Sequence, residues 1–96
     1  MEFKIILTET AGKTCDDLVQ TDPVKLKKVT KTLGLLQANP KHPSLQTHEY
    51  RSLSGPQGEK VYEAYVENRT PAAFRIFWYY GPGKGAITIV AVTSHP

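Results

Sequence analysis

A single arginine interrupts the most strand-like stretch of the sequence. Arg75 stands in the run Phe74–Tyr80, whose six other residues are apolar or aromatic. A guanidinium is normally excluded from such a setting unless it is paired with a carboxylate or used to hold an anion. The position therefore predicts either a buried ion pair or a cation that stabilises negative charge.

Two histidines and one cysteine are the residues that suggest metal binding. His42 and His48 lie six residues apart, but a third or fourth ligand is missing. Cys15 falls on the apolar face of a predicted helix and is better explained as a small core residue. We therefore expect no metal site and no cofactor.

Lysines gather on one predicted helix. Lys25, Lys28 and Lys31 project away from its apolar stripe, and such a face is most often simply solvated. If the face is functional, it would meet RNA phosphates, and the affinity would fall steeply with salt. The net charge of +3 and the pI near 9.1 permit both a nucleic acid and an acidic protein as partner.

The elements that must position these groups follow from local patterns. A short apolar run predicts a first strand, and Thr8 or Thr10 can cap a first helix whose apolar face holds Ala11, Cys15, Leu18 and Val19. Asp22-Pro23 predicts the start of a second helix, and Asn39-Pro40 its end. Three further strands are expected late in the chain, with a glycine-rich hairpin turn between the last two. The strand ranges are 3–7, 61–67, 74–80 and 86–93.

The segment between residues 40 and 60 has no clear period. Leu45, Tyr50 and Leu53 are spaced as anchors that would hold an irregular segment on the core. The element order is thus strand, helix, helix, loop and three strands. It predicts a single α+β domain over residues 1–96, with two N-terminal helices packed on one face of a small, mainly antiparallel four-stranded sheet.

Composition excludes several classes of protein. The longest apolar runs, Ile5–Leu7 and Ile89–Val92, are far shorter than the ~20 residues that a bilayer requires. The segment Met1–Lys4 lacks the features of a signal peptide. The single cysteine excludes an internal disulfide and is typical of a reducing compartment. We expect a cytoplasmic protein with no membrane partner.

Three stretches resemble the RelE/ParE superfamily of bacterial toxins: 36–45 after the second helix, 74–79 in the aromatic strand and 90–95 at the end. The resemblance covers essentially the whole chain. It implies a curved antiparallel sheet, two N-terminal helices and a cognate antitoxin as partner. It also implies one of two activities: RelE-like members cut messenger RNA on the ribosome, whereas ParE-like members inhibit DNA gyrase.

The resemblance also implies site residues. Arg75 falls where RelE- and YoeB-like nucleases carry an arginine, and His95 falls near the position of a YoeB-like catalytic histidine. Cleavage of RNA by its own 2′-hydroxyl needs a base, an acid and a cation for the phosphorane. Glu63 or His95 would serve as base or acid and Arg75 as the cation, without a metal. Tyr79 or Tyr80 would stack on a base.

The sequence also departs from the family. RelE-like nucleases have two lysines on the strand that here carries Glu63 and Tyr65, and Pro96 stands where a tyrosine or arginine often follows. Two alternatives therefore stay open beside the mRNA endoribonuclease. One is a ParE-like inhibitor that binds a protein such as gyrase, and the other is an inactive member that only binds an antitoxin. In both, Arg75 would be an arginine at the edge of the core, paired with Glu63 or Glu67.

Overall fold

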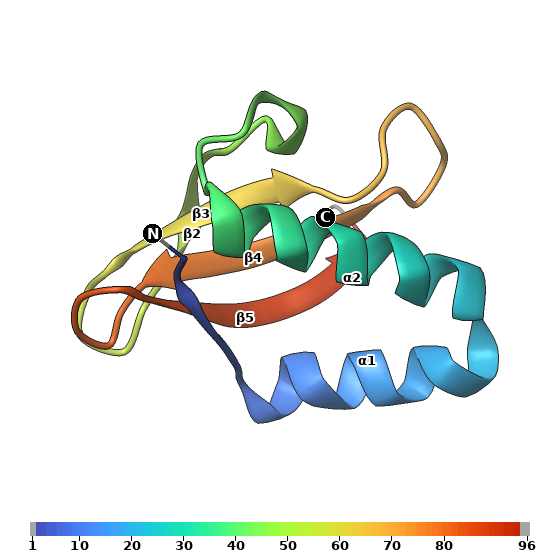
Figure 1. Ribbon diagram of the computed structural model, residues 1–96, viewed down its shortest axis with the longest axis horizontal. Helices are drawn as coiled ribbons and strands as arrows, with labels where there is room; N and C mark the ends of the chain where they lie inside the picture. Colours follow the sequence, from blue (N-terminus) through green and yellow to red (C-terminus); the bar gives the residue numbers. More distant parts are fainter. Residues whose placement is uncertain (1, 95–96) are drawn as a thin grey trace.

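The computed structural model describes residues 2–94 and contains two helices and one five-stranded sheet. The elements are β1 (Lys4–Leu7), α1 (Glu9–Thr21), α2 (Pro23–Ala38), a short 3₁₀ helix η1 (Pro43–Leu45), β2 (His48–Ser54), β3 (Lys60–Tyr65), β4 (Phe74–Tyr80) and β5 (Ala86–Ser94). The strand order is β1-β5-β4-β3-β2, with β1 parallel to β5 and every other pair antiparallel. The two helices lie together on one face of this sheet (Figure 1).

The helix boundaries follow their caps. Thr8 precedes α1 and its hydroxyl accepts a hydrogen bond from the Ala11 N–H at 3.2 Å. Asp22 does the same for α2, where Oδ1 accepts from the Lys25 N–H at 3.0 Å, and Pro23 occupies the first helical position. The predicted starts and the predicted end before Pro40 are confirmed.

The main core lies between the helices and the sheet. Its members come from both helices, η1 and the three central strands: Ala11, Leu18, Val29, Leu36, Leu45, Ala64, Ile76, Trp78, Ile87, Ile89 and Val92. Val19, predicted on the apolar face of α1, is instead 53% exposed. The even-numbered residues of β4 thus face the helices. Arg75, Phe77 and Tyr79 face the opposite side, which we call the open face of the sheet.

The predicted sheet of four strands is wrong by one strand. Residues 48–54, interpreted as an irregular segment, form β2 at the edge of the sheet, antiparallel to β3. An edge strand whose residues are nearly all exposed does not need alternating apolar residues, and its register is interrupted between Glu49 and Ser54. The sheet is also mixed, because β1 and β5 are parallel.

The predicted hairpin β4–β5 is confirmed, with a bulge that sets which residues face the helices. Gly83 and Gly85 have φ of +76° and +75° in the turn, a conformation that suits glycine. Phe77 pairs with Ala91, but Trp78 pairs with Ile89, so β5 carries one extra residue. Within residues 2–94, neither helix has the length and apolar character needed to cross a bilayer.

Candidate functional site

A buried carboxylate lies at the centre of the open face. Glu63 on β3 is 0% exposed although its side chain carries a carboxyl group. Its Oε1 lies 2.8 Å from Nε2 of His48 on β2, and its Oε2 lies 3.8 Å from Nε of Arg75 on β4. Three neighbouring strands therefore bring a histidine, a glutamate and an arginine together, which we call the open-face triad.

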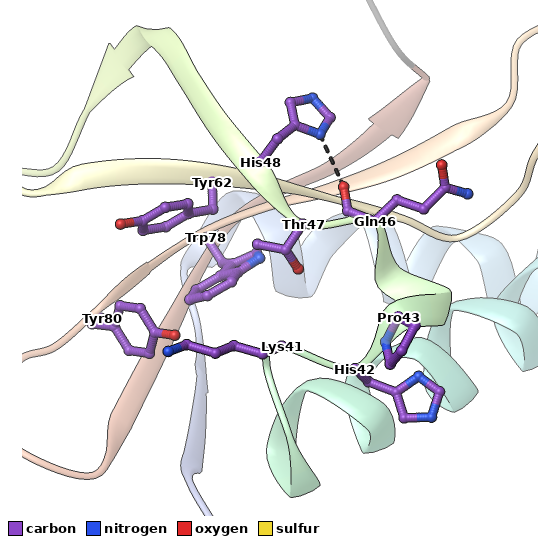
Figure 2. A pocket seen from close by; sticks show the side chains of 9 residues that line it. All are labelled: Lys41, His42, Pro43, Gln46, Thr47, His48, Tyr62, Trp78 and Tyr80. Atoms are coloured by element: carbon purple, nitrogen blue, oxygen red, sulfur yellow. Dashed lines mark hydrogen bonds between the residues drawn. The ribbon is translucent and has the colours of Figure 1, made fainter.

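Both ring nitrogens of His48 face an oxygen of the protein. Nδ1 lies 3.0 Å from the carbonyl oxygen of Gln46 (Figure 2), and Nε2 lies 2.8 Å from Oε1 of Glu63. A carbonyl oxygen only accepts hydrogen bonds, so a proton on Nδ1 suits the first contact. The two contacts together fix the orientation of the ring.

Arg75 is held by the backbone as well as by Glu63. Its Nη1 donates to the carbonyl oxygens of Glu67 at 2.7 Å and Phe74 at 3.1 Å. Its guanidinium carbon lies 3.7 Å from the centre of the Tyr65 ring, a cation–π contact. Nε is buried and has no hydrogen-bond partner within residues 2–94. The guanidinium is thus fixed in one position with bonding capacity left over.

Exposure decides which group of the triad can touch a ligand. The side chain of His48 is 48% exposed, whereas those of Glu63 and Arg75 are 1% and 10% exposed. The ring of Tyr65 lies against His48, with centroids 5.9 Å apart. In this conformation His48 is the member that reaches solvent, and Glu63 acts on a ligand only through it.

A hollow of about 410 Å³ lies on the same face of the sheet. It is lined by Tyr50, Ser52, Leu53, Phe77, Ala91, Thr93 and Ser94. Thr93 pairs with Arg75 in the sheet register, and Tyr50 follows His48 by two residues on β2. The hollow therefore lies beside the triad and has an aromatic floor, because Tyr50 and Phe77 contact each other edge to face.

Two of the three lysines predicted to bind RNA form ion pairs with a carboxylate of this chain. Lys25 Nζ lies 2.6 Å from Oε1 of Glu67, and Lys28 Nζ lies 3.2 Å from Oε2. Lys31 is exposed and, with Lys28, lines a second hollow of about 360 Å³ between α2 and the β3–β4 loop. Tyr65 lines this hollow and also contacts Arg75 of the triad.

Glu67 joins α2 to the β3–β4 loop. Burial alone would raise the pKa of its carboxyl, but hydrogen bonds from Lys25, the Phe74 N–H and Lys28 outweigh burial and lower the pKa from 4.5 to about 2. A group whose pKa is lowered by folding stabilises the fold above its ordinary pKa. That stability is lost as the pH falls through the lower value.

We therefore expect Glu67→Gln to lower the free energy of unfolding at pH 7 by on the order of 1–2 kcal/mol, discounted for solvent screening. The difference from the wild type should shrink between pH 4.5 and pH 2 and vanish below it. Urea unfolding at a series of pH values measures this. Glu49→Gln, whose carboxylate lies 3.9 Å from Arg51, is the matched control and should change stability by less than about 0.5 kcal/mol. A constant difference across the pH range would contradict the assignment.

Two further residues predicted for the site are Tyr79 and His95. Tyr79 is 8% exposed and packs with Val61 and Phe77, so it offers little ring surface to a base. Tyr80 is the exposed member of this tyrosine pair at 40%, on the helix side. His95 lies outside the described residues.

His48 is the residue of the site that the sequence did not reveal. The sequence suggests only a metal-ligand role for this residue. Pairing of β2 with β3 puts it opposite Glu63. A histidine and a glutamate fifteen residues apart on either side of a Gly-Pro turn would have been the available signal, since a hairpin brings such residues together. Among residues 2–94, no three of His, Cys, Asp or Glu gather as metal ligands.

The known proteins that match this chain match it in structure. No family model and no curated protein matches the sequence. A YoeB/ParE toxin from Agrobacterium tumefaciens superimposes with a TM-score of 0.73 at 11% identity, over 97% of this chain and 99% of that one. The similarity therefore lies in the arrangement of the elements and concerns the fold.

Two solved complexes of a toxin with its antitoxin also have a similar structure. A RelE–RelB complex from Pyrococcus horikoshii matches with a TM-score of 0.67 at 13% identity, over 98% of this chain and 96% of that chain. A heterotetrameric YoeB–YefM toxin–antitoxin complex from Staphylococcus aureus matches with a TM-score of 0.68 at 14% identity, over the whole of both chains. The chain has the fold of the RelE/ParE toxin superfamily, as the resemblance predicted.

Proposed function

We propose that this chain is the toxin of a toxin–antitoxin pair and that it cleaves messenger RNA without a metal, in the cytoplasm and on the ribosome. The observation that carries the proposal is the open-face triad, a His48–Glu63 pair in hydrogen-bond contact beside a fixed arginine. The fold supports it, because structures with this arrangement include toxins in complex with their antitoxins.

The triad supplies the chemistry that RNA cleavage needs. Attack of the 2′-hydroxyl on its own phosphate requires loss of that proton, and departure of the 5′-oxygen requires gain of one. In this proposal the 2′-hydroxyl gives its proton to His95, and His48 gives a ring proton to the leaving 5′-oxygen as that nitrogen leaves its contact with Glu63 or with the Gln46 carbonyl. Glu63 orients the ring. Arg75, whose side chain is nearly buried beside Glu63, stabilises the charge of the phosphorane through its electric field and not by direct contact. His95, the other predicted acid or base, remains a proposed catalytic residue.

Phosphates on either side of the cleaved bond would need further cations. Lys28 and Lys31 rim the hollow that Tyr65 shares with the triad, and Lys31 is exposed. We assign them to the RNA backbone, while Lys25 mainly holds Glu67. The antitoxin partner would compete for the same basic and aromatic surfaces.

A second candidate function is favoured by one observation. Glu63 and Arg75 are almost fully buried, and Arg75 is tied to two backbone carbonyls. This is also what a structural ion pair looks like, as in a ParE-like inhibitor of a protein target such as gyrase or in an inactive relative that only binds an antitoxin.

Induced expression in bacteria separates these functions. We expect the wild type to arrest growth and to leave cuts in messenger RNA within ribosome-covered codons, and Arg75→Ala to abolish both. The physical reason is that the phosphorane loses its cation, an effect of roughly 10²- to 10³-fold on the rate.

Arg75→Lys is the matched variant, because it keeps a positive charge but loses the planar fork and its stacking on Tyr65. Each variant is checked for solubility and for native circular dichroism. Arrest without cuts would move the assignment to the protein inhibitor. If folded wild-type protein causes no growth arrest, then the chain is an inactive relative that only binds an antitoxin.

A further inference from the structure

A pocket lies on the helix side of the sheet beyond the end of α2. It has a volume of about 660 Å³. Its walls come from the segment between α2 and β2 and from β3 and β4: Lys41, His42, Pro43, Gln46, Thr47, His48, Tyr62, Trp78 and Tyr80 (Figure 2). The imidazole of His48 turns away from it, so the pocket and the triad are distinct. The proposed cleavage of RNA does not use this pocket.

Three aromatic rings form one wall. Trp78 lies between Tyr62 and Tyr80, with ring centroids 5.0 Å and 4.9 Å apart, and the two tyrosines are 5.9 Å from each other. Tyr80 is 40% exposed, so its ring is open to a ligand. Such a cluster offers flat apolar surface that suits a planar group, because stacking on aromatic rings is tolerant of the base involved.

The pocket also contains a buried donor without an acceptor. Trp78 is 0% exposed, and its indole Nε1–H has no hydrogen-bond partner among residues 2–94. Figure 2 shows this nitrogen on the side of the ring toward Thr47, whose hydroxyl donates to the Pro40 carbonyl. A buried N–H without a partner is costly, so a ligand that brings an acceptor to this point is favoured.

The charge of the pocket is positive. Lys41 extends along it toward Tyr80 (Figure 2) and takes part in no salt bridge in the part of the chain that the structure describes. Among the described residues that line the pocket, none carries a carboxylate. Burial, with a smaller effect of Tyr62, raises the pKa of Tyr80, which keeps its hydroxyl protonated as a donor. All these groups favour an anion.

We propose that this pocket binds a nucleoside monophosphate unit, with the base against Tyr62 and Tyr80, a base acceptor on the Trp78 N–H and the phosphate on Lys41. Planarity, hydrogen-bond acceptors and negative charge are combined in that chemical class. The unit can be a free mononucleotide or one residue of an RNA strand that passes around the β2 edge. In the second case the inference rests on the proposed function, because the strand would be the one cleaved at the triad.

Tryptophan fluorescence tests the proposal directly, because Trp78 is the single tryptophan of the chain. Guanosine, adenosine and uridine 5′-monophosphates are titrated into the full chain, with inorganic phosphate as the probe without a base. We expect a saturable change in emission with at least one nucleotide, at a concentration at least tenfold below that needed for phosphate. An RNA trinucleotide that binds at least tenfold more tightly assigns the site to a strand, and equal affinity assigns it to the free nucleotide.

Variants identify the groups involved. Lys41→Gln should weaken nucleotide binding by roughly fivefold to tenfold. Lys13→Gln is the matched control, because Lys13 is an exposed lysine on α1 that pairs with Asp17, and it should leave nucleotide binding unchanged. Trp78→Phe, followed by calorimetry because the reporter is lost, should weaken binding by about fivefold if the N–H is used. Lys41→Gln lies on the surface and keeps the test valid if Trp78→Phe fails to fold.

Three outcomes would overturn the inference. They are the absence of saturation up to millimolar nucleotide, an identical response of Lys41→Gln and wild type, and tighter binding of a synthetic peptide of glutamate and leucine than of any nucleotide. The last would make the pocket a site for an acidic protein segment. None of these measurements requires cleavage, so the RNase assay can fail while nucleotide binding is retained, or the reverse.

Discussion

His48→Ala should slow the cleavage of RNA by about 10²- to 10⁴-fold, the usual contribution of a positioned general acid or base. The reason is that His48 is the exposed member of the triad and the buried Glu63 has no direct path to a ligand in this conformation. Without the imidazole, the proton needed by the leaving 5′-oxygen must come from water. Single-turnover cleavage of a defined messenger on purified ribosomes measures the effect.

Two further variants sharpen this test. His48→Gln keeps a donor that can face Glu63 but cannot transfer a proton, and it should be as slow as His48→Ala. Added imidazole should restore part of the rate to His48→Ala, because the position is half exposed. Wild-type rates from a folded His48→Ala protein would show that His48 only shields the carboxylate. The proton would then have to come from elsewhere, with His95 the first residue to examine.

Local signals were enough to predict most of the fold. Thr8, Asp22 and Pro23 act within one helical turn, so their capping roles could be inferred from neighbours in the sequence. Strand β4 was predicted with the right bounds, because aromatic and branched residues favour a pleated surface wherever they lie in the chain. Such features depend on few long-range contacts.

β2 could not be predicted, because its place in the sheet depends on a partner. Its side chains are nearly all exposed, so no buried face imposes alternation. Strand β2 is held in place by its antiparallel pairing with β3 and by the contact of Tyr50 with Phe77. Without this strand, the sequence could not show that His48 lies opposite Glu63.

For the same reason, only part of the candidate site could be predicted from the sequence. The sequence predicts Arg75 and Glu63 as site residues, and the structure places Nε of Arg75 3.8 Å from Oε2 of Glu63. Burial, however, was not predictable, because it depends on how β2 and the β3–β4 loop close over the open face. The ion pairs of α2 could not be predicted either. Lys25 and Lys28 pair with Glu67, which lies 42 and 39 residues away in the sequence.

Glu63→Ala should lower the free energy of unfolding by about 3–5 kcal/mol, which is the cost of leaving a buried charge without its partner. Arg75 is 8% exposed and would remain charged, with Nε facing the cavity left by the carboxylate. Glu49→Ala removes an exposed carboxylate from the neighbouring strand and should cost less than about 1 kcal/mol. Urea unfolding at pH 7 measures each value.

The double variant Glu63→Leu with Arg75→Met separates stability from chemistry. Replacing both charges by apolar side chains of similar size removes the unpaired charge, so most of the stability lost in Glu63→Ala should return. The same protein should be unable to cleave RNA. If the stable double variant still arrests growth, then the ion pair is structural and the toxin acts as a binder of a protein target. If it is stable and inert, then the buried pair is retained for its chemistry, since the fold does not require it.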